Sequence, residues 1–185
     1  CDSHGAMGLF YAWDGIIRCQ DGTARVNLLL NRASPWMDID SYLPYEGKVV
    51  LRNKTAREAF VRIPLWVDRK AVHCRLDGKG GRDVKNVWFG NYLHFEGLEP
   101  DDVLTIQFPM VERTEVWMIP KCFPSWPGPD QQLHTCRFRG NTLIEVTPPL
   151  LKDIPLYQHR PEEFKSRQAP MKKVTRYVTS QRLQW

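Results

Sequence analysis

Two residues at the start of the chain have a spacing that metal sites use. Cys1 and His4 form a Cys-x-x-His pair, and a thiolate and an imidazole are both zinc ligands. A zinc site needs three or four ligands, and no second Cys-x-x-Cys or His-x-x-x-His pair follows in the sequence. The alternative is a cysteine at the start of a helix beside a histidine that has no function. On spacing alone, therefore, the pair does not define a metal site.

The remaining cysteines have no motif context. Cys74 alternates with Val72 and Leu76, which is typical of a small, buried apolar side chain. The total of five cysteines is odd, with no paired spacing, and this favours a reducing compartment over a disulfide scaffold. Disulfide pairing among some of the five cysteines remains an alternative. Three of them lie in no recognisable motif: Cys19, Cys122 and Cys136.

Acid and base groups do not assemble into a catalytic set in the sequence. The histidines are scattered between strand and loop residues, without a Ser/His/Asp or Cys/His arrangement: His73, His94, His134 and His159. Four carboxylates could pair as acid and base for glycoside cleavage: Asp38, Asp40, Glu112 and Glu115. Strand alternation places Asp38 and Asp40 together on a polar face, which favours exposed surface carboxylates. We therefore assign no catalytic residue from these patterns.

Seven tryptophans and six tyrosines raise a binding hypothesis. Flat aromatic rings stack on sugars, so one hypothesis is a carbohydrate-binding module. The alternative is packing in the core and at interfaces, which is what most aromatic side chains do. The tryptophans considered for stacking are Trp36, Trp66, Trp88 and Trp126.

Composition excludes several classes of protein. The chain has 185 residues, 42% hydrophobic and 25% charged, which suits one globular core. No apolar run approaches the roughly 20 residues of a membrane helix. The net charge of +5 resides in residues 160–185, where seven Lys and Arg face two Glu, and the rest is balanced. Basic residues interleaved with acids are typical of a solvated surface, so we expect neither nucleic acid nor a membrane as partner.

Alternation with a period of two dominates the middle of the chain and predicts antiparallel strands without helices between them. Predicted strands centre on segments 25–31, 49–51, 59–65, 72–76 and 104–108, with turn residues between them. A strand over 88–95 follows the Asp77-Gly78 turn, and one or two more surround Gly140-Asn141. Pro64 cannot donate to a ladder, so its strand lies at an edge or breaks there. The pattern indicates a β-sandwich.

The two ends differ from the middle. Residues 8–17 are almost without polar side chains and predict a helix that other sequence covers, so we expect the chain to be a piece of a longer protein. Prolines cluster over 120–129 and recur to Pro170, which predicts an irregular extension. Apolar residues within 150–157 predict that this extension wraps over the sandwich or over a missing domain.

Several segments resemble glycoside hydrolase family 127, the β-L-arabinofuranosidase-like enzymes. The opening Cys1-Asp2-Ser3-His4-Gly5 and the helix to Trp13 resemble the segment that ends the helical barrel of that family. Four later segments are also similar in order and spacing: 26–31 (VNLLLN), 41–47 (SYLPYEG), 61–66 (VRIPLW) and 138–143 (FRGNTL). The resemblance spans nearly the whole chain, although no single motif decides it.

The resemblance implies a parent enzyme with an (α/α)6 barrel followed by β-sandwich domains. In that family a zinc-bound cysteine thiolate attacks the anomeric carbon and a glutamate acts as acid and base, with retention of configuration. Cys1 matches the second of two zinc-binding cysteines, which makes it the metal ligand that the resemblance implies, with zinc as cofactor. The acid/base glutamate and the nucleophile would lie outside these residues, and the carbohydrate substrate would bind in the parent barrel.

We therefore expect an all-β fold: an antiparallel β-sandwich with a short N-terminal helix remnant and a Pro-rich C-terminal extension. Residues 1–18 are predicted to end the helical-barrel catalytic domain, 19–118 to form the sandwich, and 119–185 to form the wrapping extension. The predicted role is support of the barrel in a zinc-dependent, cysteine-nucleophile glycoside hydrolase, without activity of its own. A carbohydrate-binding sandwich module is the alternative.

Overall fold

A computed structural model describes residues 2–78, 81–120, 130–149, 166–175 and 178. It is an all-β fold with one N-terminal helix, as the sequence predicts, and it divides into two compact units. The first unit comprises residues 1–43, 47–109 and 170–185, and the second comprises 44–46 and 110–169. The second unit is thus an insertion in the first. Within the described residues, no helix is long and apolar enough to cross a bilayer.

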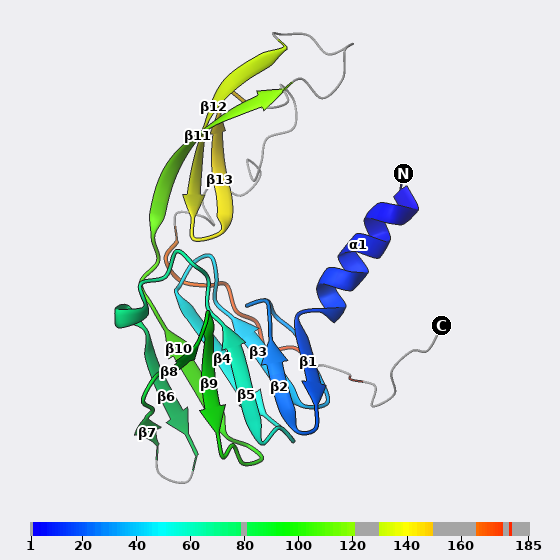
Figure 1. Ribbon diagram of the computed structural model, residues 1–185, viewed down its shortest axis with the longest axis vertical. Coiled ribbons are helices and arrows are strands. Elements are labelled where there is room, and N and C mark those ends of the chain that lie inside the picture. Colours follow the sequence, from blue (N-terminus) through cyan, green and yellow to red (C-terminus); the bar gives the residue numbers. More distant parts are fainter. Residues whose placement is uncertain (1, 79–80, 121–129, 150–165, 176–177, 179–185) are drawn as a thin grey trace. The chain divides into compact units, whose positions relative to one another are not determined.

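The first unit is a sandwich of two five-stranded sheets (Figure 1). The first sheet has the order β1-β2-β5-β9-β8: Ile17–Gln20, Thr23–Val26, Glu58–Arg62, Tyr92–Glu96 and Val87–Phe89. The second sheet has the order β3-β4-β10-β6-β7: Met37–Ser41, Lys48–Asn53, Val103–Gln107, His73–Asp77 and Arg82–Asp83. The strands pair antiparallel except β2 and β5, which run parallel.

Alternation along the strands builds the core of this sandwich. Val26, Val61 and Leu93 of the first sheet are fully buried, as are Leu51 and Ile106 of the second. Intervening positions such as Arg25, Arg52 and Arg75 are exposed. Apolar side chains at every second position therefore face the other sheet, which is the arrangement that a period of two requires.

Helix α1 (Asp2–Asp14) ends three residues before the predicted helix, which extends to residue 17. Ile16 and Ile17 are buried, because the helix stops at Asp14 and Ile17 begins β1. This strand was not predicted, and it begins inside the segment assigned to the barrel. A single 3₁₀ turn, Arg69–Ala71, precedes β6.

The predicted strand over 25–31 is wrong beyond Val26. The backbone amides of Asn27 and Leu28 both donate to the carbonyl of Ile16, so the chain leaves the sheet there. As a result Leu29 is buried, whereas Leu28 and Leu30, predicted to face the core with Val26, are exposed.

One further strand prediction needs correction, and one is confirmed. The predicted strand over 88–95 is a hairpin, in which β8 and β9 are joined at Gly90 and Asn91. Gly90 has a φ of 58°, a left-handed conformation that favours glycine. β5 ends at Arg62, so of the two outcomes expected at Pro64 the break in the strand is confirmed, and β5 lies inside the sheet.

The second unit contains a three-stranded sheet in the order β11-β12-β13: Glu112–Pro120, Gln131–Arg139 and Thr142–Thr147. β12 and β13 are the two strands predicted around Gly140-Asn141, and Gly140 has a φ of 58° in their turn. The predicted domain boundary after residue 118 falls inside β11. The proline cluster over 121–129 and the apolar residues over 150–157 lie outside the described residues.

Asn53, at the end of β4, supports the turn into β5. Its buried side chain donates to the carbonyls of Ala56 and Glu99 at 2.8 and 2.7 Å and accepts from the amide of Ala56 at 3.0 Å. The one amide group therefore satisfies three backbone groups, from the two turns that follow β4 and β9.

We predict that Asn53→Ala lowers the free energy of unfolding by about 2–3 kcal/mol, because it leaves buried backbone groups without partners. Urea denaturation monitored by fluorescence measures the loss. Gln107→Ala, at an exposed position of β10, is the control and should change stability by less than about 0.5 kcal/mol. Equal effects of the two substitutions would contradict the role of Asn53.

Candidate functional site

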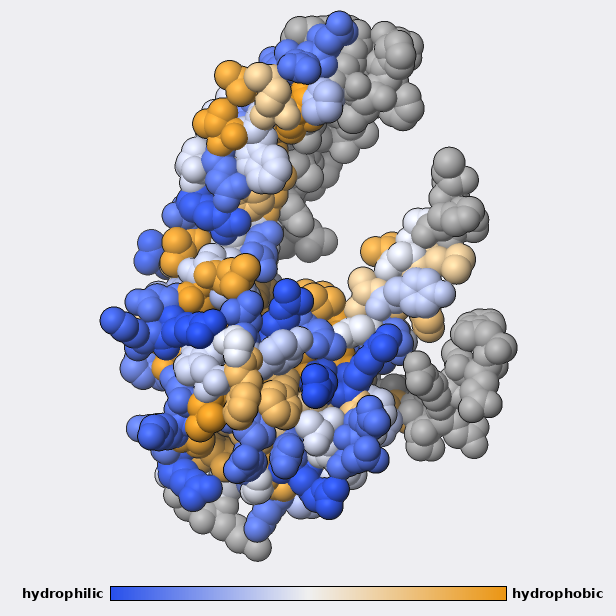
Figure 2. All heavy atoms as spheres, viewed as in Figure 1, coloured by the Kyte–Doolittle hydropathy of each residue, from blue (hydrophilic) through white to orange (hydrophobic). Residues whose placement is uncertain are grey.

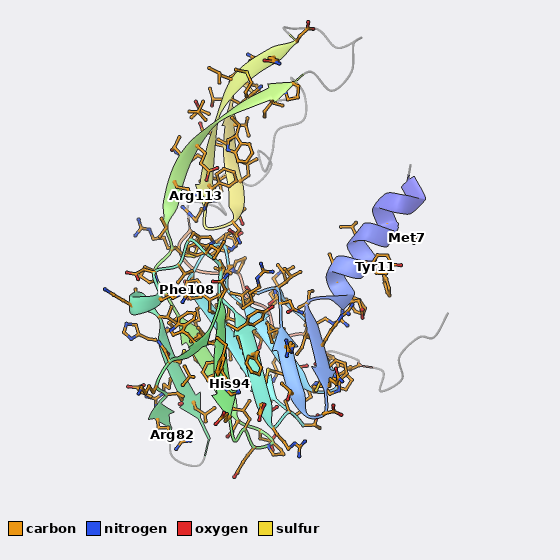
Figure 3. All side chains as sticks on the ribbon, in the orientation of Figure 1. Met7, Tyr11, Arg82, His94, Phe108 and Arg113 are labelled. Atoms are coloured by element: carbon orange, nitrogen blue, oxygen red, sulfur yellow. The ribbon has the colours of Figure 1, made fainter. Side chains whose placement is uncertain are left out.

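Helix α1 exposes apolar side chains around its circumference. Leu9 is 75% exposed, Tyr11 59% and Trp13 51%. Figure 2 shows apolar residues along α1, and Figure 3 shows Met7 and Tyr11 away from the strands of the first unit. A helix that is apolar all round belongs in the interior of a protein. The exposed apolar side chains of α1 therefore form a surface suited to packing against other protein.

The C-terminal end of α1 is fixed to the sandwich. Arg32 donates to the carbonyl of Trp13 at 2.8 Å, and its guanidinium carbon lies 3.1 Å from the centre of the Trp13 ring. Burial lowers the pKa of Arg32, and the charge of Asp14 acts in the opposite direction. Asn27 donates to the carbonyl of Gly15 at 3.0 Å and accepts from the hydroxyl of Tyr92 at 3.0 Å. These bonds connect the end of α1 to β9.

The described residues do not assemble a metal site. Cys1, the predicted zinc ligand, lies outside them, and so does the side chain of His4. Within the described part of the chain, no three His, Cys, Asp or Glu side chains come together in a group that holds a metal ion. Cys74 is buried, as its alternation predicts, and burial raises the pKa of its thiol to about 12.

The four carboxylates considered for catalysis each face a basic side chain. Asp38 pairs with Lys54 at 2.7 Å and Asp40 with Arg52 at 3.2 Å, on the polar face of β3 that the sequence predicts. Glu112 pairs with Arg139 at 2.8 Å.

Glu115 has an environment opposite to that of a general acid. Hydrogen bonds from Arg113 and then Trp117 lower its pKa, whereas a general acid needs a raised one. Arg113 donates to Glu115 at 2.6 Å and Trp117 at 2.9 Å. The preference for surface carboxylates over catalytic ones is thus consistent with these contacts.

The histidines are separated, as the sequence indicates. His73 is exposed on β6, and Nδ1 of His134 lies 2.7 Å from the carbonyl oxygen of Pro148. His159 lies outside the described residues. His94 differs from these, because it packs against aromatic rings on the outward side of the first sheet.

Three of the tryptophans considered for sugar stacking are half-buried: Trp36, Trp66 and Trp88. The Trp66 ring packs edge-on against Phe108, with centres 5.6 Å apart, and Arg69 lies over Trp88 at 5.0 Å. Trp126 lies outside the described residues. Packing therefore occupies part of the rings of Trp66 and Trp88.

Sequence analysis missed an aromatic cluster around His94. The His94 ring stacks on Phe60, with centres 4.3 Å apart, and meets Phe89 edge-on at 5.2 Å. Arg25 lies 5.4 Å from the centre of the Phe60 ring. The signal was present in the sequence, since Phe60 and His94 take the outward positions between the buried residues of β5 and β9. Aromatic side chains at outward strand positions mark this face as more than a solvated surface.

We predict that Cys74 resists iodoacetamide at pH 8 in the native protein. Because its pKa is raised to about 12, the thiol stays protonated at pH 8, and the thiolate is the reactive form. Peptide mass spectrometry after labelling measures the modified fraction. The denatured chain is the control and should react fully. Equal labelling rates in both states would show that the thiol is accessible and ionised.

Compared by sequence, the chain matches no family profile and no curated protein. Compared by structure, it is similar to a family 127 β-arabinofuranosidase, with a TM-score of 0.49 and 16% identity over 69% of this chain and 23% of the enzyme. A family 127 β-L-arabinofuranosidase from Geobacillus stearothermophilus T6 gives a TM-score of 0.46 and 16% identity over 69% and 21%. A third structure, described as a glycoside hydrolase, gives 0.41 and 18% over 65% and 20%. The chain thus spans about a fifth of the glycoside hydrolases that it is similar to, and two of these belong to the family that its sequence resembles.

Proposed function

We propose that this chain is the β-sandwich portion of a glycoside hydrolase related to the family 127 β-L-arabinofuranosidases, and that it supports a helical catalytic domain. The observation that carries the proposal is the exposed apolar circumference of α1. The sequence resemblance suggests which domain would cover that surface, because the opening segment resembles the end of the family's helical barrel. α1 would then be a barrel helix, covered by its neighbours.

The energetics favour such a cover. Full burial of one large apolar side chain contributes about 1.5–3 kcal/mol. Met7, Leu9, Phe10, Tyr11 and Trp13 are all exposed on α1, so their joint burial is a large driving force for docking. Gly5 and Gly8 add to the argument, because a Cβ at either position meets nothing within 4 Å. Glycine inside a helix costs about 0.5–1 kcal/mol relative to alanine, and the described contacts do not repay it.

The attachment of α1 to the sandwich would fix the orientation of the catalytic domain. Arg32 and Asn27 fix the C-terminal end of the helix, so the direction of α1 follows from the sandwich. A helical domain that packs around α1 would take its orientation from the same contacts. In this role the sandwich acts on catalysis by positioning and contributes no reacting group.

Zinc belongs to the proposal only through the sequence resemblance. Cys1 would be one of its ligands, and the others would come from outside this chain. A thiolate is a regular zinc ligand, and bound zinc keeps a thiol ionised at neutral pH. Zinc measured by atomic absorption in the longer protein, with and without Cys1→Ser, tests this assignment independently of activity.

The alternative function is a carbohydrate-binding module. Phe89 and Trp117 favour it, because they are exposed aromatic rings on the described strands. Affinity electrophoresis in gels of neutral arabinan separates the two functions. A supporting domain migrates unretarded, and a polysaccharide-binding module is retarded.

We predict that this chain alone, assayed with zinc, does not hydrolyse an aryl β-L-arabinofuranoside. In the longer protein, Leu9→Glu should lower both the melting temperature of the helical domain and the hydrolysis rate, because it places a charge in a buried contact. Circular dichroism and release of the aryl group measure these effects. Turnover by the chain alone would contradict the proposal.

Leu65→Glu is the matched control, since Leu65 is the most exposed large apolar residue that the described part of unit 1 has outside α1. It should leave both the melting temperature and the rate unchanged. If Leu9→Glu behaves like Leu65→Glu, α1 does not dock against the catalytic domain.

A further inference from the structure

A cavity of about 230 Å³ lies at the edge of the sandwich where β7, β8 and β9 come together. Apolar side chains form much of its wall: Leu76, Val84, Phe95 and Leu98. Arg82, Lys85, His94 and Glu96 supply its polar groups, and Phe89 also lines it. Figure 3 shows Arg82 on β7 and His94 on β9. The cavity is smaller than the roughly 300–1,000 Å³ of drug-sized pockets, so it suits a single ring and not a chain of rings.

Among the described residues no carboxylate lies within 4.0 Å of Arg82 or Lys85, and Glu96 is the one acid that lines the cavity with them. Two carboxylates lie nearby on β6 and β7, but both face Arg75. Asp77 accepts from Arg75 at 2.7 Å, and Asp83 is the register partner of Arg75 and raises its pKa. Arg82 is the register partner of Leu76 and so takes the other face of β7. Strand alternation therefore separates Arg82 from these acids and directs it to the cavity.

His94 lines the cavity as a fixed, largely buried ring. Its side chain is 9% exposed, and Nε2 has no hydrogen-bond partner in the described part of the chain. The nearest carboxylate oxygens lie 3.9 Å from Nε2, on Glu58, and 3.5 Å from Nδ1, on Glu96. Phe60 and Phe89 hold the ring in place. Because Nε2 is also closed to solvent, a ligand in the cavity would meet the ring of His94 and not this nitrogen.

An apolar ring surface stands beside these groups. Phe89 is 55% exposed, although it is part of the cluster that holds His94. Such a ring is suited to stack on the C–H face of a sugar, while polar groups nearby bond to its hydroxyls. The cavity thus combines a flat apolar surface, a carboxylate that can accept from hydroxyls and an excess of positive charge.

The geometry points to a binding site for a uronic acid, a sugar ring that carries a carboxylate. The carboxylate pairs with Arg82 and Lys85, the ring stacks on Phe89, and the hydroxyls bond to Glu96. The choice of a sugar acid over another acid rests on the proposed function, whereas the cavity and its charges do not. α1 does not line the cavity, so this site and the docking surface are independent.

The test is an NMR titration of the whole chain with D-galacturonate, D-galactose and benzoate, which follows the backbone amides of Val84, Val87 and Phe89. We expect saturable shifts with galacturonate, and weaker ones with galactose, which lacks the carboxylate, and with benzoate, which lacks the hydroxyls. Added salt should weaken only the binding of the two acids. Equal affinity for galactose and galacturonate, or no shifts with galacturonate, would overturn the inference.

Substitutions locate the site. Arg82→Gln and Lys85→Gln should each weaken galacturonate binding about three- to five-fold, the size of one exposed ion pair, and leave galactose unchanged. Phe89→Ala should weaken both sugars. Arg18→Gln, on the opposite edge strand β1, is the control and should change nothing. Unchanged galacturonate affinity in both charge variants overturns the site, and leaves the prediction for Leu9 in the longer protein untouched.

Discussion

The structure depends on how its apolar surface is covered. In the first unit the two sheets cover each other, and every second residue of the inner strands is buried. α1 has no such cover in the described part of the chain, and its bonds to the sandwich lie at its C-terminal end, through Arg18, Asn27 and Arg32. The sandwich therefore buries the inner faces of its own two sheets but leaves α1 uncovered. This imbalance is the basis of the proposal that α1 packs against another domain and that the sandwich supports it.

A second constraint acts at the edge of the sandwich, where strand β7 has to be protected from pairing with other chains. Edge strands present unpaired backbone groups, and short strands with charged side chains protect them from pairing with other chains. β7 has two residues, and Arg82 takes its inward position. At this edge Arg82 also lines the cavity, beside apolar side chains and His94. Protection of an edge and recognition of an anionic ring thus use the same residue.

The sequence predicted the parts of the fold that depend on alternation. The strands around Val49, Ala59, Cys74 and Leu104 were found because their buried residues recur at every second position. The end of β2 was missed, because a bond from Asn27 to Ile16, which only the folded chain brings together, ends the strand. The cluster at His94 was missed for a similar reason. Its residues come from β5, β8 and β9, and their proximity depends on strand order, which alternation does not encode.

The order of the strands has a consequence for how the sandwich forms. Between the parallel neighbours β2 and β5 the chain crosses to the other sheet, builds β3 and β4 there, and returns. Neither sheet can be completed from one continuous stretch of chain, so both must assemble together. Contacts between residues far apart in sequence slow folding, because loop-closure entropy is lost before the contacts form. The sandwich should therefore fold in one slow, cooperative step, in which neither sheet is stable without the other.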